Sequence, residues 1–242
     1  MSQIEDWYKK DLAYIHDVGF GDFAFKSAAA IVEILQTNNL ECGLIIDLGC
    51  GGGLSAREFI DANYRVLGID ISAAAVAIAK KRVPEAEFKI ESLFKAKIPP
   101  CIAVTSIGEC LNYLFDPENN LQILTILFDR IYRALLPGGI LIFDLLQPHA
   151  TKKTQGFKEG EDWLIFYEKE ENCQQKLLTR RITTFRKQGN YYRRDDETHR
   201  ACLYEVAEII DRLSQVGFQV QTQNNYGDFY LSPSHTVFIA QK

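Results

Sequence analysis

Between residues 44 and 146 the chain alternates short, continuously apolar runs with longer stretches of helical spacing. Continuous apolar strands separated by helices are typical of a parallel sheet that is buried on both faces. The pattern predicts a helix ahead of the first strand, at 23–36, and later helices at 54–62, 73–81 and 119–136. Strands are predicted at 44–48, 65–70, 87–90, 101–107 and 140–146. This alternation predicts a doubly wound α/β fold.

The alternation stops after the fifth predicted strand. Residues 158–200 instead predict two or three antiparallel strands with charged faces, at 163–169, 176–187 and 191–199. Helical spacing returns at 203–216, and two last strands are predicted at 218–223 and 235–240. The loop between these last strands is too short for a parallel crossover, so the final strand should be antiparallel. We therefore predict a seven-stranded sheet in the order 3-2-1-4-5-7-6.

Composition narrows the class of partner. The net charge is −5, whereas proteins that hold nucleic acid through its phosphates usually carry a basic excess, so we expect a small-molecule partner and no nucleic acid. No apolar run approaches the roughly 20 residues of a membrane-spanning helix, and residues 1–6 lack the basic and apolar parts of a secretory signal. Six cysteines without a CxxC pair favour reduced thiols. We expect a cytoplasmic protein that does not contact membranes.

The most informative segment is a glycine-rich loop, Asp47-Leu48-Gly49-Cys50-Gly51-Gly52-Gly53, between a predicted strand and a predicted helix. It lies at the carboxyl end of the sheet, where such folds bind ligands, and glycines there let the backbone approach a ligand closely. A dinucleotide fingerprint has glycines in the order G-x-G-x-x-G, but counted from Gly49 its last position is Leu54. The loop reads D-x-G-x-G-x-G instead.

This loop resembles the first motif of the class I S-adenosylmethionine-dependent methyltransferases. Asp70 ends the second predicted strand, where that family has an acidic residue on the ribose hydroxyls. Glu91-Ser92 follows the third strand, and Leu135-Leu136-Pro137-Gly138-Gly139-Ile140 matches the family's turn before strand five. The resemblance covers about residues 40–146 by motif and the final helix and strand pair by pattern.

The resemblance implies a Rossmann-like fold and S-adenosylmethionine as cofactor, with S-adenosylhomocysteine as product. Asp70 would accept charge-assisted hydrogen bonds from the ribose, Gly51 and Gly53 would bring backbone amides to the methionine portion, and Asp47 would anchor the loop or its ligand. Glu91-Ser92 would stand at the adenine. The implied cofactor-binding residues are Asp47, Gly49, Cys50, Gly51, Gly53, Asp70, Ile71, Glu91, Ser92 and Ser106.

One departure from the family bears on the chemistry. Strand four often begins with an acidic residue in this family, and here the stretch reads Cys101-Ile102-Ala103-Val104. That position can be structural, so methyl transfer is still expected. Amino-group chemistry that requires an acid there is disfavoured.

The expected reaction is methyl transfer to a nitrogen or oxygen atom of a small molecule, for which alignment of the two reactants is the main task. An amine acceptor need only be neutral, whereas a hydroxyl or carboxyl acceptor is helped by a base. The predicted catalytic residues are Tyr14 and His16, from an aromatic and glycine-containing leader, and Glu109, a carboxylate among apolar neighbours that needs a partner. No cluster has metal-ligand spacing, so no metal is predicted.

We predict one methyltransferase domain over residues 1–242. Residues 1–40 would form a helical N-terminal lid, and the β insert at 158–200 would form a wall of the acceptor pocket. Closing both over the cofactor would exclude water. The aromatic residues of the insert suit a homodimer contact as well, or simple packing of a hairpin on the domain.

Two other classes of protein remain open at this point. A non-catalytic cofactor-binding or interaction protein could keep the same loop. A nicotinamide-dependent oxidoreductase is disfavoured by Leu54 and by the lack of a Tyr-x-x-x-Lys pair near the site. The nucleoside released by denaturing the purified protein would separate the oxidoreductase from the other two.

Overall fold

A seven-stranded sheet forms the centre of the computed structural model, which describes residues 7–116, 119–149 and 153–242. The strand order is β10-β13-β5-β4-β1-β2-β3, and β13 runs antiparallel to both of its neighbours. The predicted order 3-2-1-4-5-7-6 is therefore confirmed. The strands are β1 (Leu44–Leu48), β2 (Arg65–Asp70), β3 (Glu87–Ile90), β4 (Cys101–Ser106), β5 (Leu135–Leu146), β10 (Gln219–Gln223) and β13 (His235–Gln241).

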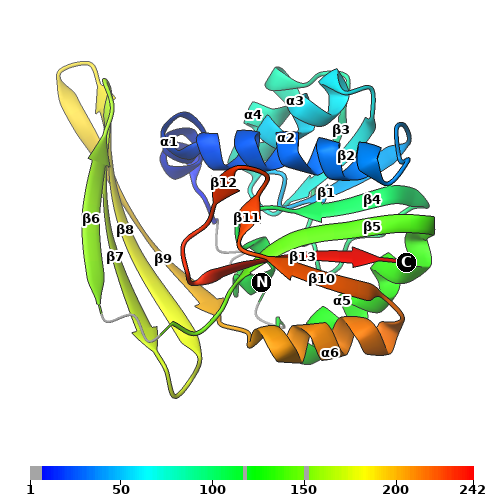
Figure 1. The fold of residues 1–242 in the computed structure, drawn as a ribbon. Coiled ribbons are helices and arrows are strands. Elements are labelled where there is room, and N and C mark those ends of the chain that lie inside the picture. The colour runs from blue at the N-terminus through cyan, green and yellow to red at the C-terminus, as the bar shows by residue number, and fades with distance from the viewer. Residues whose placement is uncertain (1–6, 117–118, 150–152) are drawn as a thin grey trace.

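Helices cover both faces of this sheet (Figure 1). One face carries α2 (Asp22–Thr37), α3 (Leu54–Asp61) and α4 (Ala73–Arg82), and the other carries α5 (Leu121–Ala134) and α6 (Val206–Val216). A single 3-10 turn, η1 (Cys110–Asn112), follows β4, and the first helix, α1 (Lys10–Phe20), stands beyond the edge of this layer. The result is the predicted doubly wound arrangement.

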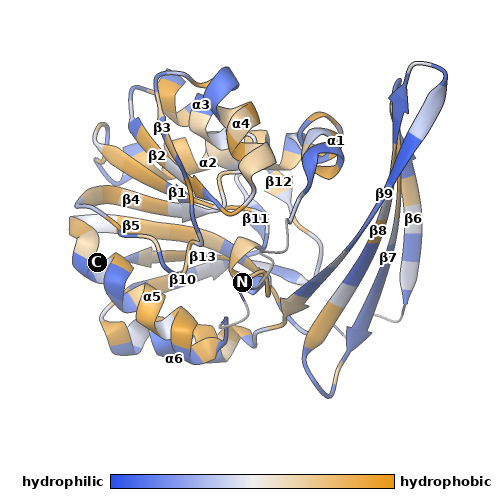
Figure 2. Cartoon of the chain, turned by 180° about the vertical axis from the view of Figure 1, so that it is seen from behind, coloured by the Kyte–Doolittle hydropathy of each residue, from blue (hydrophilic) through white to orange (hydrophobic). Residues whose placement is uncertain are grey.

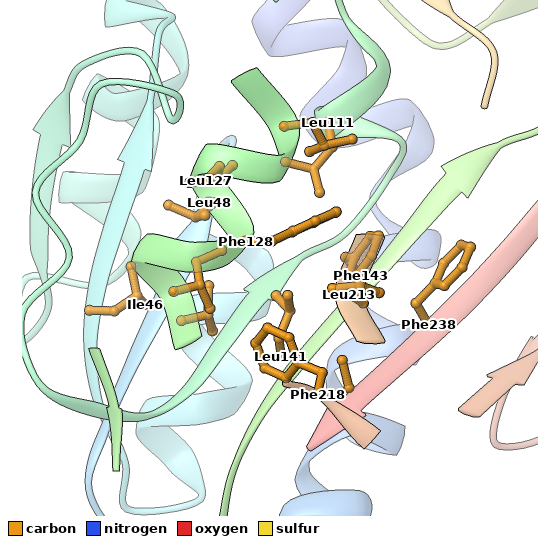
Figure 3. Packing of buried hydrophobic residues seen from close by; sticks show 14 of the residues in the cluster. Ile46, Leu48, Leu111, Leu127, Phe128, Leu141, Phe143, Leu213, Phe218 and Phe238 are labelled. Carbon is orange, nitrogen blue, oxygen red and sulfur yellow. The ribbon is translucent and has the colours of Figure 1, made fainter. Parts of the chain in front are cut away.

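Local sequence signals set the ends of these helices. The Ser72 hydroxyl accepts from the Ala75 amide at 3.1 Å and caps α4, and Asn120 caps α5 in the same way. In α5 the apolar residues recur at helical spacing and pack on the sheet in one buried cluster, part of which Figure 3 shows. They are Leu124, Leu127, Phe128 and Ile131.

A separate four-stranded antiparallel sheet interrupts the α/β pattern. Its strands are β6 (Thr154–Glu159), β7 (Trp163–Asn172), β8 (Leu177–Gln188) and β9 (Tyr191–Cys202). We name it the second sheet. The predicted insert at 158–200 thus widens to 154–202, because β6 was not predicted. The segment Thr154–Glu159 is polar and exposed, and only its pairing with β7 makes it a strand.

Two smaller differences from the predicted elements concern turns. The Pro137-Gly138-Gly139 turn lies inside β5, where the pairing with β4 shifts register, so the strand begins at Leu135 and α5 ends at Ala134. The loop before the last strand contains a short hairpin, β11 (Asn225–Tyr226) and β12 (Phe229–Tyr230).

Helix α1 connects the two sheets. Figures 1 and 2 show it between the carboxyl end of the main sheet and the second sheet. Leu12 and Ile15 of α1 pack with Trp163, Ile165 and Ile182 of the second sheet in a small apolar cluster. The second sheet therefore stands over the same end of the main sheet as the glycine loop. Among the described residues, no helix is long and apolar enough to cross a membrane.

Candidate active site

The glycine loop turns sharply between β1 and α3. Gly49, Gly51 and Gly53 have φ angles of 81°, 51° and 77°, which side chains rarely adopt. A Cβ on Gly49 would stand 2.4 Å from the Cys110 sulfur, whereas one on Gly51 would meet nothing within 4 Å. The Gly51 backbone therefore faces open space, as a loop that holds a ligand requires.

Asp70 stands beside this loop at the end of β2. Its Oδ2 accepts from the Gly51 amide at 2.9 Å and its Oδ1 accepts from the Ser72 amide at 2.8 Å. Burial raises the pKa of Asp70, and these donors oppose the shift. Each oxygen still has a second lone pair, so Asp70 can shape the loop and accept hydrogen bonds from a ligand as well.

Asp47 has an unsatisfied oxygen. The side chain is buried, Thr105 Oγ1 donates to Oδ1 at 2.9 Å, and Oδ2 has no hydrogen-bond partner in the described residues. Burial raises the pKa of Asp47 to about 7, although the Thr105 hydrogen bond lowers it. A buried carboxylate oxygen without a partner is costly, so a donor from a ligand would stabilise it.

A partly buried ion pair holds α1 against the glycine loop. Both Arg82 terminal nitrogens reach the Asp17 carboxylate, at 2.6 and 2.7 Å, and Arg82 Nη1 also donates to the Gly52 carbonyl. A Cβ on Gly52 would stand 2.2 Å from Asp17 Oδ1. Gly52 is therefore needed for the close approach of α1, a role distinct from that of Gly51.

Glu109 has the partner that its sequence context demanded. It follows β4 in the left-handed region, with φ 57°, and is only 8% exposed. Arg180 of β8 donates to Glu109 Oε1 at 2.5 Å and the Tyr113 hydroxyl donates at 2.9 Å. Burial alone would raise the pKa of Glu109, but Arg180 and His235 hold it well below its usual range. The carboxylate stays ionised and is a weak proton acceptor.

These groups surround one cavity of about 600 Å³. Its floor consists of Asp47, Gly49, Cys50, Gly51, Gly52, Asp70, Ile71 and Ser92. Its roof consists of residues from α1, the β4–η1 loop, the second sheet and the strand before the C-terminus, among them Tyr8, His16, Glu109, Tyr113, Tyr167, Lys169, Arg180 and His235. Most of the remaining lining is apolar or aromatic, as in pockets for small molecules.

His16 reaches the cavity with its ring exposed to it. The rings of Tyr8 and Phe20 flank it, with centroids 5.3 and 6.0 Å away. Crowding by protein atoms and the positive charge of Arg180 lower the pKa of His16 below its ordinary value. The imidazole is therefore neutral at pH 7 and can accept a proton.

Four predicted site residues do not line the cavity. The Tyr14 hydroxyl faces Asp162 at 3.5 Å on the side of α1 that packs against the second sheet, so we do not propose it as catalytic. Glu91 is exposed, outside the lining, whereas Ser92 beside it is inside. Gly53 packs against Ala79, and the Ser106 hydroxyl ties β4 to β1 through Leu48 O at 2.9 Å. Gly53 therefore supports the glycine loop, and Ser106 joins two strands of the sheet.

Sequence reasoning missed five residues that shape the site. Arg180 and Lys169 lie in a charged insert whose pattern does not say which face turns inward. The Asp17–Arg82 pair joins segments 65 residues apart. Asp144 at the end of β5 accepts from the amides of Gly108 and Glu109, both at 2.8 Å, and so sets the loop that carries Glu109. An acidic residue at a strand end was the only local signal for Asp144.

The fold and the site define a class: a Rossmann-like α/β protein whose nucleoside-binding loop opens into a covered cavity. Residues 45–139 match the family model described as a methyltransferase domain. A protein from Geobacillus sp. (strain WCH70) that carries a provisional methyltransferase name is 30% identical over 193 residues, which cover 73% of this chain and 74% of the relative. The chain belongs to the S-adenosylmethionine-dependent methyltransferases.

Solved structures agree on the fold. An S-adenosylmethionine-dependent methyltransferase from Clostridium acetobutylicum ATCC 824 aligns with a TM-score of 0.80 at 18% identity, covering 95% of this chain and 96% of the other. CalS10, an amino pentose methyltransferase from Micromonospora echinaspora, aligns at 0.76 and 14% identity, covering 94% and 96%. Because the chain belongs to the methyltransferase family, the nicotinamide oxidoreductase considered from the sequence is not its class. No group of His, Cys, Asp or Glu in the described ranges could hold a metal ion.

Proposed function

We propose that the protein methylates a nitrogen or oxygen atom of a small molecule held in the cavity between its floor and its roof. This proposal rests on one observation. The glycine loop and two segments distant from it in the sequence, α1 and the second sheet, line the same cavity of about 600 Å³. A space of this size suits a cofactor together with a small acceptor. It does not suit a polymer, and the net charge of −5 argues in the same direction.

The floor fits the cofactor on two observations. Asp47 Oδ2 is buried without a partner, which suits a cationic donor, and the Gly51 backbone faces open space. Asp47 and Asp70 would hold the amino-acid and ribose portions, with Ser92 and Ile71 beside the base. When bound, S-adenosylmethionine supplies an electrophilic methyl group on its sulfonium.

Two residues of the roof, His16 and Glu109, have different proposed roles in the reaction. His16 is neutral and exposed to the cavity, so it can accept a proton from an acceptor hydroxyl or ammonium group. Glu109 cannot do this efficiently because Arg180 keeps it ionised at low proton affinity. We therefore propose His16 as the catalytic base and Glu109 as a group that positions Arg180 and the acceptor.

The test is turnover by His16→Ala. General-base catalysis contributes typically about 10²–10⁴-fold, so turnover should fall at least about 100-fold while the free energy of unfolding changes by less than about 1 kcal/mol. His149→Ala is the matched control, since His149 is outside the cavity lining. Unchanged turnover in His16→Ala would remove the histidine from the chemistry.

The acceptor atom requires a separate experiment. The protein is incubated with methyl-labelled S-adenosylmethionine and a panel of amines, alcohols and carboxylic acids, and labelled products are identified by mass spectrometry. An N- or O-methylated product supports the proposal and names the acceptor atom. Cofactor binding without transfer to any member of a broad panel would favour the alternative, a non-catalytic cofactor-binding protein.

We further propose that α1 and the second sheet close as a lid. Residues 1–6 of the predicted lid lie outside the described residues. Glu197 of β9 accepts from the amides of Tyr8 and Lys9, each at 2.9 Å, and the Asp11 carboxylate binds Arg193, so α1 and the second sheet would move together. Cofactor and acceptor together should slow amide exchange in both segments. Protection confined to the glycine loop would refute the lid.

A homodimer through the second sheet is also proposed. Phe157, Phe166 and Phe185 form a row of ring contacts on the outer face, with centroids 6.0 and 6.2 Å apart, and the first two are 63% and 45% exposed. Exposed apolar patches of this kind favour association. Phe166→Arg should convert a dimer to a monomer in sedimentation analysis, and a wild-type monomer at high concentration would refute the proposal.

The six free cysteines support a cytoplasmic location.

A further inference from the structure

The inner face of the second sheet presents two cations to the cavity. Along β7 the residues Ile165, Tyr167 and Lys169 alternate into the lining, while Phe166 between them is exposed on the outer face. Lys169 is paired across the strands with Arg180, so both side chains leave the same face of the sheet. The roof thus holds an ammonium and a guanidinium group as neighbours.

Within residues 7–116, 119–149 and 153–242, Arg180 has a carboxylate at ion-pair distance and Lys169 does not. Arg180 is bound to Glu109 at 2.5 Å. Lys169 Nζ has no carboxylate oxygen within 4.0 Å in the described parts of the chain, and its nearest recorded interaction is with the Tyr167 ring, 5.6 Å from the centroid. Its other cross-strand neighbour, Thr154 on β6, is uncharged. Lys169 therefore carries a charge that no carboxylate of the described residues contacts at ion-pair distance.

Three other carboxylates of the cavity are already engaged, whereas the fourth, Asp47 on the floor, keeps one oxygen without a partner in the described residues. Asp17 binds Arg82, Asp70 binds backbone amides, and Asp116 binds Lys95 at 3.3 Å. Burial and the charge of Arg180 lower the pKa of Lys169. An anion brought into the cavity would relieve this repulsion. Arg180 Nε, on the neighbouring strand, is buried and has no hydrogen-bond partner among the described residues.

We propose that Lys169, assisted by Arg180, binds an anionic group of the methyl acceptor, a carboxylate or a phosphate. This inference rests on the proposed function and names the class of acceptor it uses. An anion here would balance the charge of Lys169 and turn the rest of the acceptor toward the floor. Both anions share the chemistry that an ammonium and a guanidinium recognise, oxygen atoms with negative charge.

The experiment begins with the protein saturated with S-adenosylhomocysteine, whose binding is first measured by calorimetry. Inorganic phosphate and succinate are then titrated in separate arms at constant ionic strength. We expect one of them to bind, and Lys169→Met to weaken that binding at least about tenfold, as the loss of a charge-assisted hydrogen bond predicts. The anion that binds more tightly identifies the group.

Two controls keep the interpretation clear. Lys169→Arg should restore binding to within about threefold, because the charge returns. Lys153→Met removes the same charge from the outer face, where Lys153 binds Glu168 at 2.7 Å, and should leave anion binding unchanged. Binding that is equal in wild type and Lys169→Met, or absent in wild type, overturns the anion site. Failure to bind S-adenosylhomocysteine would instead overturn the proposed floor, so the two failures are distinguishable.

Discussion

The floor of the cavity comes from one stretch of chain, 47–92, whereas the roof comes from four segments spread between residue 8 and residue 235. In the floor, most of the groups that shape the site are backbone amides and glycines, and a turn between a strand and a helix fixes their positions. In the roof, side chains from two sheets and a helix meet, and the pairs Arg180–Glu109 and Arg193–Asp11 hold them together. The floor is a local structure, and the roof exists only when distant elements pack.

This difference has a chemical counterpart. Parallel sheets place ligands at the carboxyl ends of their strands, so a floor built there suits a ligand that many proteins share. A roof assembled from an insert can change its side chains without disturbing the sheet. We therefore propose that the roof sets specificity for the acceptor. The comparison predicts that roof substitutions affect stability and acceptor binding, and floor substitutions affect cofactor binding.

The largest effect is expected from Arg180→Met, which leaves Glu109 buried without its counter-charge. Breaking a buried pair on one side typically costs about 3–5 kcal/mol, so the free energy of unfolding in urea should fall by that amount. Arg181→Met is the matched control, since Arg181 is half exposed and its ion pairs face solvent. It should cost less than about 1 kcal/mol. Equal losses in the two variants would show that the roof pair is no more important than a surface pair.

The next effect tests the floor. Asp70→Ala removes the hydrogen bond from the Gly51 amide and those proposed from the ribose, so the affinity for S-adenosylhomocysteine should fall at least about tenfold in calorimetry. Glu91→Ala changes an exposed carboxylate one strand away and should leave affinity unchanged. If Asp70→Ala binds normally while its fold is intact, the ribose assignment is wrong.

A smaller effect concerns the pH dependence of folding stability, through Asp47. The pKa of Asp47 is raised to about 7 in the fold, above its unfolded value, so the folded state binds the extra proton. This contribution to stability is complete below the unfolded pKa, near pH 4, and is lost as pH rises through 7. Without ligand, Asp47→Asn should therefore show a weaker loss of stability between pH 5 and 8 than wild type.

Cofactor binding should reverse that shift. A cationic donor at Asp47 Oδ2 favours the ionised form, so S-adenosylhomocysteine should release up to about half a proton per site near pH 7. Calorimetry in buffers of different ionisation enthalpy measures this release. Asp47→Asn should bind without it, and a release of the same size in that variant would assign the proton to another group.

The smallest effect is expected from Tyr14→Phe. The hydroxyl makes one long contact with Asp162, at 3.5 Å, and the ring still packs under Arg186 without it. Stability should change by less than about 0.5 kcal/mol and turnover should stay at the wild-type level. A clear loss of turnover would return Tyr14 to the site and would show that the roof rearranges when the acceptor binds.

Much of the floor was predictable because its signals are local. Asp47, Gly51, Asp70 and Ser92 stand at strand ends or in the turn that follows, and periodicity alone locates those ends. The predicted set and the cavity lining differ by a few residues: Glu91 is outside the lining while Ser92 is in it, and Gly53 packs against Ala79 of α4. Spacing along the chain does not resolve the direction of a side chain at a turn.

The amino-acid sequence by itself determined the order of strands, the antiparallel last strand and the cofactor loop, because apolar periodicity and short connections constrain the backbone locally. It also required a partner for Glu109, because a buried carboxylate needs one. Only the tertiary structure decided that this partner is Arg180, that α1 is bound to the loop through Asp17 and Arg82, and that Lys169 faces the cavity. The strands of the insert carry apolar residues on both faces, so alternation alone does not fix their orientation, and packing against α1 fixes it instead.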